Sequence, residues 1–346
     1  MNVLYFIGNG FDLNVGLKTR FKDVLSLYIK ESTNDVVIKT FKKNIELKSN
    51  TWAAFEEEMG RYTNTIQKKE TPIETFLDYS TCILDFKKFL KSFLEKEKSK
   101  IKYDDTQNIA KTFKNALFNF TEFLNCDPKV IMDEINKGII KFSYINFNYT
   151  SVFDNCLNIL KKSNIFQLEK RIESGPFKGI ITGHNDLGRV IHIHGTLDSN
   201  LILGVNDLKQ IKNTDFHSLE KIHTYIKPNV NDALENHRNT DAMKLLKDAD
   251  IYCIFGMSLG KTDKKWWIEI GKQLITFPEK QLIIYAYNEN HDASFPEHTL
   301  EAKDLYKNNF LKHFRFSKLD KDDLKEKIKK NIHVVINPDI FKMKLF

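Results

Sequence analysis

Cysteine and proline are both scarce in this sequence of 346 residues, which contains four cysteines and seven prolines. The cysteines are Cys82, Cys126, Cys156 and Cys253, and no two of them form a C-x-x-C pair. The spacing gives no support to a zinc ribbon, and so few cysteines argue against a disulfide framework. We therefore expect reduced, buried thiols, as is typical of a cytoplasmic protein.

Long apolar runs are also missing from the sequence. Residues 3–7 are apolar, but this stretch is too short for the apolar core of a signal peptide and no basic segment precedes it. No run approaches the roughly 20 residues that a membrane-spanning helix needs. The sequence thus predicts a cytoplasmic protein that has no membrane partner.

The charge is only moderately basic and is not concentrated in one region. Lysine and arginine number 53 against 46 acidic residues, which gives a net charge of +7. Basic and acidic residues are mixed, as in residues 318–330. A nucleic-acid-binding face would need clustered basic residues. We interpret the charge as a solvated, lysine-rich surface and expect no nucleic-acid partner, although the net charge keeps such binding as a third alternative.

Several short apolar runs indicate the buried strands of an α/β protein. They are residues 3–7, 142–147, 190–193, 251–255, 282–287 and 333–336. A further run, 201–205, predicts a strand that forms a hairpin with 190–193. The predicted fold is α/β, with a Rossmann-like, mostly parallel sheet formed by residues 1–30 and 141–346.

The remaining residues, 31–140, contain no convincing strand and predict a large α-helical insertion. Two amphipathic helices are expected, at about 73–94 and 109–124. The first has aromatic and aliphatic residues in steps of three and four from Phe76 to Phe93. Packing of this stripe inside the protein is favoured, and self-association into a homo-oligomer is the alternative.

Four polar or glycine-rich motifs come directly after predicted strands. They are Gly8-Asn9-Gly10-Phe11-Asp12, Asn146-Phe147-Asn148-Tyr149-Thr150, His192-Ile193-His194-Gly195 and Gly256-Met257-Ser258-Leu259-Gly260. In open α/β sheets, ligands bind outside the carboxyl ends of the strands. The four motifs therefore predict the walls of one pocket, with a nucleotide as the leading ligand.

The first motif has two interpretations that the sequence leaves open. Gly8, Asn9 and Gly10 could let backbone amides approach a phosphate at a helix N-terminus. The third glycine of the dinucleotide fingerprint is replaced by Leu13, so a tight turn with only a structural role is equally well supported. Asp12 could cap the helix or bind a ligand hydroxyl.

The next two motifs supply amides and imidazoles. Asn146 and Asn148 could bind a carboxamide, a sugar hydroxyl or a water molecule, and an Asx turn is the alternative. His192 and His194 are two residues apart on a predicted strand and should share a face. General acid–base chemistry is favoured over metal binding because no third ligand is evident, and two structural histidines are the alternative. Gly195 would let a ligand approach the backbone.

Polar residues after the later strands complete the predicted site. Gly256 and Ser258 belong to the motif that joins the next strand to a helix, and Ser258 could donate to a phosphate or ribose oxygen. Asn288 ends the next strand, where an adenosine is often bound. Thr262 and Asp263 are candidate helix caps. The sequence contains neither a G-x-S-x-G elbow nor a P-loop.

The combined motifs resemble the AbiH family of bacteriophage abortive-infection proteins. The matching blocks are Ile7 to Leu13, Gly16-Leu17-Lys18-Thr19, Asn146 to Thr150, His192 to Gly195, and Phe255 to Leu259 with Asp263 and Trp267. A more distant pattern is similar to the sirtuin-like NAD-binding fold. That resemblance implies that Gly8 and Gly10 hold a pyrophosphate, that Asn148 and His194 are catalytic, and that Gly256 and Ser258 form the serine block. The sirtuins' cysteine-ligated zinc module has no counterpart in this sequence, so deacylation is not implied.

These resemblances imply an antiviral protein that hydrolyses NAD⁺ in infected cells, without a metal. A phage-derived trigger would activate it, and the helical insertion would restrain it until then. The alternative is a non-catalytic nucleotide sensor that switches a partner protein.

Overall fold

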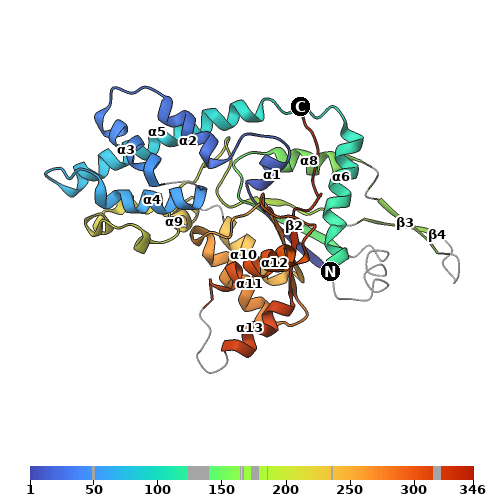
Figure 1. Ribbon diagram of the computed structural model, residues 1–346. Coiled ribbons are helices and arrows are strands. Elements are labelled where there is room, and N and C mark those ends of the chain that lie inside the picture. Colours follow the sequence, from blue (N-terminus) through green and yellow to red (C-terminus); the bar gives the residue numbers. More distant parts are fainter. Residues whose placement is uncertain are drawn as a thin grey trace.

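The protein is built on a parallel sheet of six strands in the part of the chain that the computed structural model describes (Figure 1). That part comprises residues 1–48, 51–123, 140–163, 165, 167–172, 179–184, 186–234, 237–314 and 321–346. The strands are β1 (Asn2–Ile7), β2 (Lys141–Asn146), β5 (Val190–His192), β6 (Ile251–Phe255), β7 (Gln281–Ala286) and β8 (Ile332–Ile336). Every neighbouring pair in this sheet is parallel, which confirms the predicted α/β, Rossmann-like fold.

The order of the strands locates the site. Across the sheet the order is β5-β2-β1-β6-β7-β8, so the chain builds outward from β1 in one direction and then continues from β6 in the other. This is the order of dinucleotide-binding folds, and the direction reverses between β1 and β6. The crevice outside the carboxyl ends of these two strands is the general ligand position in such sheets.

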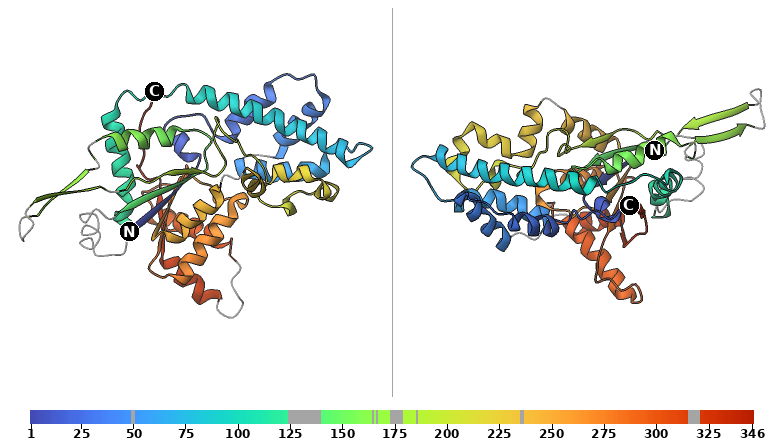
Figure 2. Two further views of the ribbon diagram at one scale, coloured as in Figure 1. Left: turned by 180° about the vertical axis from the view of Figure 1, so that it is seen from behind. Right: turned by 90° about the horizontal axis from the view of Figure 1, so that it is seen from above.

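Helices cover both faces of the sheet, so its central strands are continuous apolar runs (Figure 2). One face lies under α1 (Gly10–Asn14), α6 (Thr106–Phe118) and α8 (Val152–Lys162), where Phe11, Phe113, Phe153 and Phe341 pack together. The other face lies under α10 (Arg238–Asp248), α11 (Lys264–Thr276), α12 (Pro296–Leu311) and α13 (Lys321–Lys330). Trp266 and Trp267 of α11 pack edge-on or tilted against Phe6 at the centre of this second layer.

A second hydrophobic core lies beside the sheet, in the helical part of the protein. It is formed by α2 (Phe21–Lys30), α3 (Val36–Lys48), α4 (Trp52–Thr65) and α5 (Pro72–Lys98). Thr71 and Glu74 form a capping box at the start of α5, with Pro72 in the first turn. The α5 stripe that begins at Phe76 is buried against these neighbours, so it serves packing within the protein.

The two cores do not divide the chain at the predicted boundaries of the insertion. Helix α2 falls within residues 1–30, yet it packs in the helical core. Helix α6 falls within 31–140, yet it packs on α8 against the sheet and is followed by the 3₁₀ turn η1 (Asn119–Phe123). The helical core is completed by residues far downstream, in η3 (Leu208–Gln210), η4 (Thr214–Ser218), η5 (Glu220–Tyr225) and the start of α9 (Lys227–Ala233).

The predicted strand at 201–205 and its hairpin are wrong. These residues form no strand, and Val205 makes only an isolated bridge to Ile226. Leu203 and Val205 are apolar because they fill the helical core, a requirement that a five-residue run cannot distinguish from a strand. The hairpin in the described chain is instead antiparallel β3 (Gln167–Ile172) and β4 (Gly179–His184), which the sequence did not predict. None of the described helices is long and apolar enough to cross a membrane.

Candidate functional site at the strand ends

The turns that follow β1 and β6 pack against each other, backbone to backbone. The amide of Gly8 donates to Phe255 O and the amide of Gly10 donates to Gly256 O, each at 2.9 Å. A Cβ on Gly10 would lie 2.3 Å from Gly256 Cα, and Gly256 has φ +71°. The glycines at the switch point are therefore required by this close contact, whatever ligand lies beside it.

Replacing Gly10 with alanine is expected to lower the free energy of unfolding by about 1–3 kcal/mol, because the new methyl group meets backbone that cannot rotate away. Chemical denaturation measures this loss. Ser258→Ala is the matched control in the facing turn, since Ser258 is exposed and should change stability by less than about 0.5 kcal/mol. A Gly10→Ala protein as stable as the control would contradict the close packing.

Asn148 and Asp12 form a buried polar contact beside this turn. The Asn148 side-chain amide donates to Gly8 O at 3.1 Å and to Asp12 Oδ1 at 3.3 Å. The hydroxyl of Thr150 donates to Asp12 Oδ2 at 2.7 Å. Asp12 is the third residue of α1, so it does not cap the helix, and its carboxyl holds the Asn-x-Thr segment after β2. The side-chain NH₂ group of Asn148 is thus used by Gly8 and Asp12, and no described residue donates a hydrogen bond to its side-chain oxygen.

Burial changes the ionisation of Asp12. It is only 2% exposed, and this burial, with the charge of Asp154, raises its pKa to about 7. Hydrogen bonds from Thr150 and Asn148 and the proximity of His192 oppose the shift without cancelling it. A titratable group with such a pKa at a strand end is a frequent mark of a functional site.

The raised pKa predicts how stability responds to pH. Between about pH 4 and pH 7 the unfolded carboxyl is ionised while the folded one stays protonated, so Asp12 stabilises the fold less as pH rises. Relative to the parent, the Asp12→Asn variant should therefore become more stable as pH rises. Its free energy of unfolding should gain about 2–3 kcal/mol on that of the parent between pH 5 and pH 8. Denaturation at several pH values measures this difference. Asp198→Asn, at an exposed position, is the control, and its difference from the parent should hardly vary with pH. The same flat result for Asp12→Asn would show that Asp12 has an ordinary pKa and would contradict the prediction.

Asn146, the last residue of β2, is fully buried. Its side-chain oxygen accepts from the amide of Asn148 at 2.9 Å, which is an Asx-type turn. Its side-chain nitrogen has no partner among the described residues. An unpaired buried donor of this kind costs about 1–3 kcal/mol. The turn thus explains the side-chain oxygen of Asn146, and it leaves the side-chain NH₂ group of Asn146 unexplained.

The two histidines contact different sides of the sheet. Strand β5 ends at His192 and a turn follows, so the alternation expected for a continuous strand does not apply. The ring of His192 lies 3.0 Å from Asn148 O and 3.0 Å from the carboxylate of Asp154, on α8. His194 instead packs edge-on against Phe147 and approaches α11. Each imidazole therefore has its own acidic partner.

The acidic partner of His194 belongs to a buried cluster of charges. Nε2 of His194 lies 3.4 Å from Asp263 Oδ1, without hydrogen-bond geometry. Lys227 Nζ donates to the same Asp263 oxygen at 3.2 Å. It also donates to both carboxylate oxygens of Glu56, at 3.1 and 3.0 Å. Charged contacts thus run from Glu56 through Lys227 to Asp263, and Asp263 is the member of the cluster that lies beside His194.

The charges in this cluster support one another. Burial alone would raise the pKa of Asp263, but Lys227 and His194 lower it well below its usual value. Burial would likewise lower the pKa of Lys227, but Asp263 and Glu56 raise it above its usual value. Both shifts favour the charged forms, so the lysine and the aspartate form an ion pair at neutral pH.

The other predicted site residues surround these contacts or lie farther along the edge. Asn9 donates to Thr19 O at 2.8 Å, and Ser258 is exposed after β6. Asn288, after β7, is held in a turn by hydrogen bonds with Asn337. Gly195 has φ +73°, and a Cβ there would lie 1.7 Å from Asn200 O, so the turn after His194 already accounts for this glycine.

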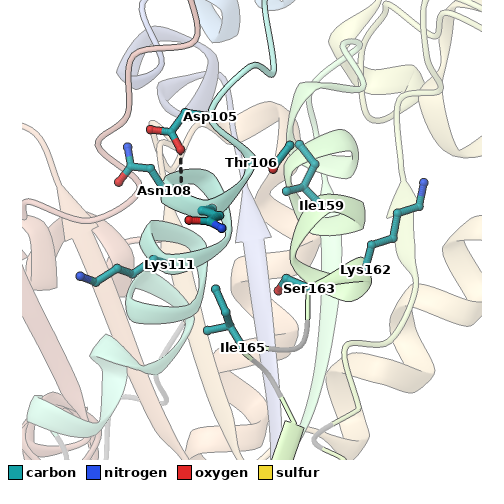
Figure 3. Close-up of a pocket in the computed structure, with 9 residues that line it drawn as sticks. Asp105, Thr106, Asn108, Lys111, Ile159, Lys162, Ser163 and Ile165 are labelled. Carbon is teal, nitrogen blue, oxygen red and sulfur yellow. Dashed lines mark hydrogen bonds between the residues drawn. The ribbon is translucent and has the colours of Figure 1, made fainter.

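A cavity of about 730 Å³ lies between α6 and α8, at the surface of the first helical layer (Figure 3). Asn108 and Lys111 of α6 line it together with Asp105, the residue before this helix, and Ile159 and Lys162 line it from α8. It includes none of the residues predicted for the strand-end site. We therefore assign it no part in that site.

Sequence reasoning missed several residues that the structure brings to the site. Asp154 was not singled out as a site residue. Asp263 was noted as a candidate helix cap and as part of the AbiH pattern, and its side chain makes no capping hydrogen bond. Lys227 and Glu56 lie 171 residues apart, and no local pattern pointed to their contact. Thr150 was part of a quoted motif, and its place two residues after Asn148 was the signal that could have identified it.

Comparison with protein-family models shows which family the chain is related to. Residues 4–287 match the family described as "Bacteriophage abortive infection AbiH". The matched segment runs from β1 to the end of β7 and includes Asn148, His194, Lys227 and Asp263, while Asn288 falls just outside it. No curated protein matches the chain. Because the match extends over most of its length, the chain belongs to the AbiH family of bacteriophage abortive infection proteins.

Proposed function

We propose that the protein carries out its role in abortive infection by binding NAD⁺ at the strand ends and hydrolysing the nicotinamide–ribose bond. Loss of NAD⁺ would stop the metabolism of an infected cell. The proposal also includes a sirtuin-like relationship and a cytoplasmic location. The observation that supports it most is the strand order, whose switch point lies beside the glycine turns and next to Asn148.

The position of Asn148 supports a role for its side chain in this reaction. Its NH₂ group is directed to Gly8 O and Asp12, so its free oxygen is the atom left to face a ligand. An amide oxygen accepts hydrogen bonds from water or from a ribose hydroxyl. Asn148 would therefore orient the attacking water or the ribose, and its dipole would stabilise positive charge on the sugar.

The chemistry balances with the residues at hand. The bond between C1′ of the ribose and the nicotinamide nitrogen breaks, and its electron pair neutralises the pyridinium. Water forms the new bond to C1′, and its proton passes to His194 before it reaches solvent. The products are nicotinamide, ADP-ribose and one proton. Imidazole is suited to this transfer near neutral pH.

A nucleotide sensor without turnover is the second candidate. It is favoured by the burial of Asn148 and His194, which are 5% and 6% exposed. In this case the pocket would bind the nucleotide and switch a partner protein. The same burial is compatible with an enzyme that stays silent until a phage-derived trigger opens the site.

One assay separates the two candidates. The purified protein is incubated with NAD⁺, alone and with lysate from phage-infected cells, and nicotinamide and intact NAD⁺ are followed by chromatography. Hydrolysis predicts stoichiometric nicotinamide and ADP-ribose, at least in the triggered sample. Recovery of intact bound NAD⁺ would support the sensor, and neither binding nor release would contradict both.

A further inference from the structure

The buried cluster at His194 connects the helical part of the protein to the strand ends. Glu56 is on α4, Lys227 is the first residue of α9, and Asp263 precedes α11. Helices α4 and α9 lie side by side in the helical part (Figure 1). Lys227 is 3% exposed, so the contact lies inside the protein and depends on the packing of these helices.

The lysine in this cluster is fully occupied. An ammonium group has three protons to donate, and Lys227 donates to two oxygens of Glu56 and one of Asp263. Its position is thereby fixed by Glu56, and Asp263 is fixed in turn by Lys227. The oxygen of Asp263 that receives this proton is the same one that lies 3.4 Å from His194 Nε2.

Helix capping does not explain Asp263, and ordinary hydrogen bonding does not explain the buried His194. Asp263 stands at the N-cap of α11, yet its side chain makes no capping hydrogen bond. His194 is 6% exposed, and its Nε2 is buried without a well-formed hydrogen bond among the described residues. Such an unsatisfied nitrogen is costly in a folded protein and calls for an explanation.

We propose that Glu56, Lys227 and Asp263 are positioning residues that orient the imidazole of His194 and make its orientation depend on the docking of α4. This inference rests on the proposed function, in which His194 accepts the proton. It goes further by giving the helical part a physical means of control. Any partner that shifts α4 would withdraw Glu56, loosen Lys227 and release Asp263 from the imidazole.

The test compares Glu56→Gln with Glu57→Gln, its neighbour on the same helix. Glu57 pairs with Arg61 at the surface, at 3.1 Å, and belongs to no part of the cluster. Steady-state nicotinamide release gives kcat and KM. The ¹⁵N signals of His194, assigned by comparison with His194→Gln, report the state of the ring without any turnover.

For Glu56→Gln we expect kcat to fall about 10- to 100-fold with KM within about threefold, as a misplaced catalytic group would give. The His194 ¹⁵N signals should shift or broaden. Glu57→Gln should match the parent in both measurements. Glu56→Asp keeps the charge on a shorter side chain, so its kcat should lie between those of Glu56→Gln and the parent. This variant replaces Glu56→Gln in the test if Glu56→Gln does not fold.

The two proposals fail in different ways. If Glu56→Gln leaves the His194 signals and kcat unchanged, the positioning inference is overturned while NAD⁺ hydrolysis stands. If the parent releases no nicotinamide but Glu56→Gln still shifts the His194 signals, the positioning holds and the NAD⁺ reaction is overturned. Equal effects of Glu56→Gln and Glu57→Gln would mean that the cluster contributes only to the stability of the protein, and this result would also overturn the inference.

Discussion

Replacing Lys227 with methionine will destabilise the protein by about 3–5 kcal/mol, the cost of breaking a buried ion pair on one side. Lys227 neutralises both Glu56 and Asp263 and donates to each of them. Methionine has a similar volume, so the packing is largely kept while two carboxylates lose their counter-charge. Denaturant unfolding of the purified variant at neutral pH measures the loss.

Lys264→Met is the matched control for this effect. Lys264 Nζ lies 3.2 Å from Asp207, the same distance as Lys227 from Asp263, but 43% of its side chain is exposed. An exposed pair contributes only about 0–1 kcal/mol. Equal losses in the two variants would show that the Lys227 cluster is solvated in solution, contrary to its burial here.

Asn148→Ala is expected to lower the rate of nicotinamide release about 10²- to 10³-fold, the usual effect of removing one preorganised dipole from a reacting centre. Asn148 is the residue whose free side-chain oxygen lies beside the switch-point turns. Its loss also removes a donor from Asp12, so thermal unfolding must be measured alongside the rate.

The control for Asn148 is another asparagine on the adjacent element. Asn158 is exposed on α8, away from the strand ends, and Asn158→Ala should retain the parent rate. A folded Asn148→Ala protein with undiminished release would remove the amide from the mechanism. It would leave the NAD⁺ reaction itself to be assigned to other residues.

The sheet was predictable because parallel strands covered on both faces must be nearly continuous apolar runs. Residues 3–7 and 251–255 are of this kind, and both are central strands. Residues 201–205 look the same in sequence, but they are apolar because Leu203 and Val205 pack under helices. The composition of a short apolar run indicates that the run is buried, but it does not indicate whether a sheet or helices bury it.

Residues of the candidate site could be grouped from the sequence only where they follow strands closely. Asn148 and His194 could be chosen because strand ends meet at one edge of a parallel sheet. Lys227 could not, because its partners are 171 and 36 residues away and their contact depends on how the helical part docks. Asp12 was expected to cap a helix or bind a ligand, whereas tertiary contacts turn it toward Thr150 and Asn148.

The most direct test of the account is a crystal structure of Asn148→Ala soaked with NAD⁺, because an impaired variant should keep the dinucleotide intact. We expect NAD⁺ across the ends of β1 and β6, with the nicotinamide ribose between residue 148 and His194. NAD⁺ bound only in the cavity between α6 and α8, or elsewhere on the surface, would contradict it.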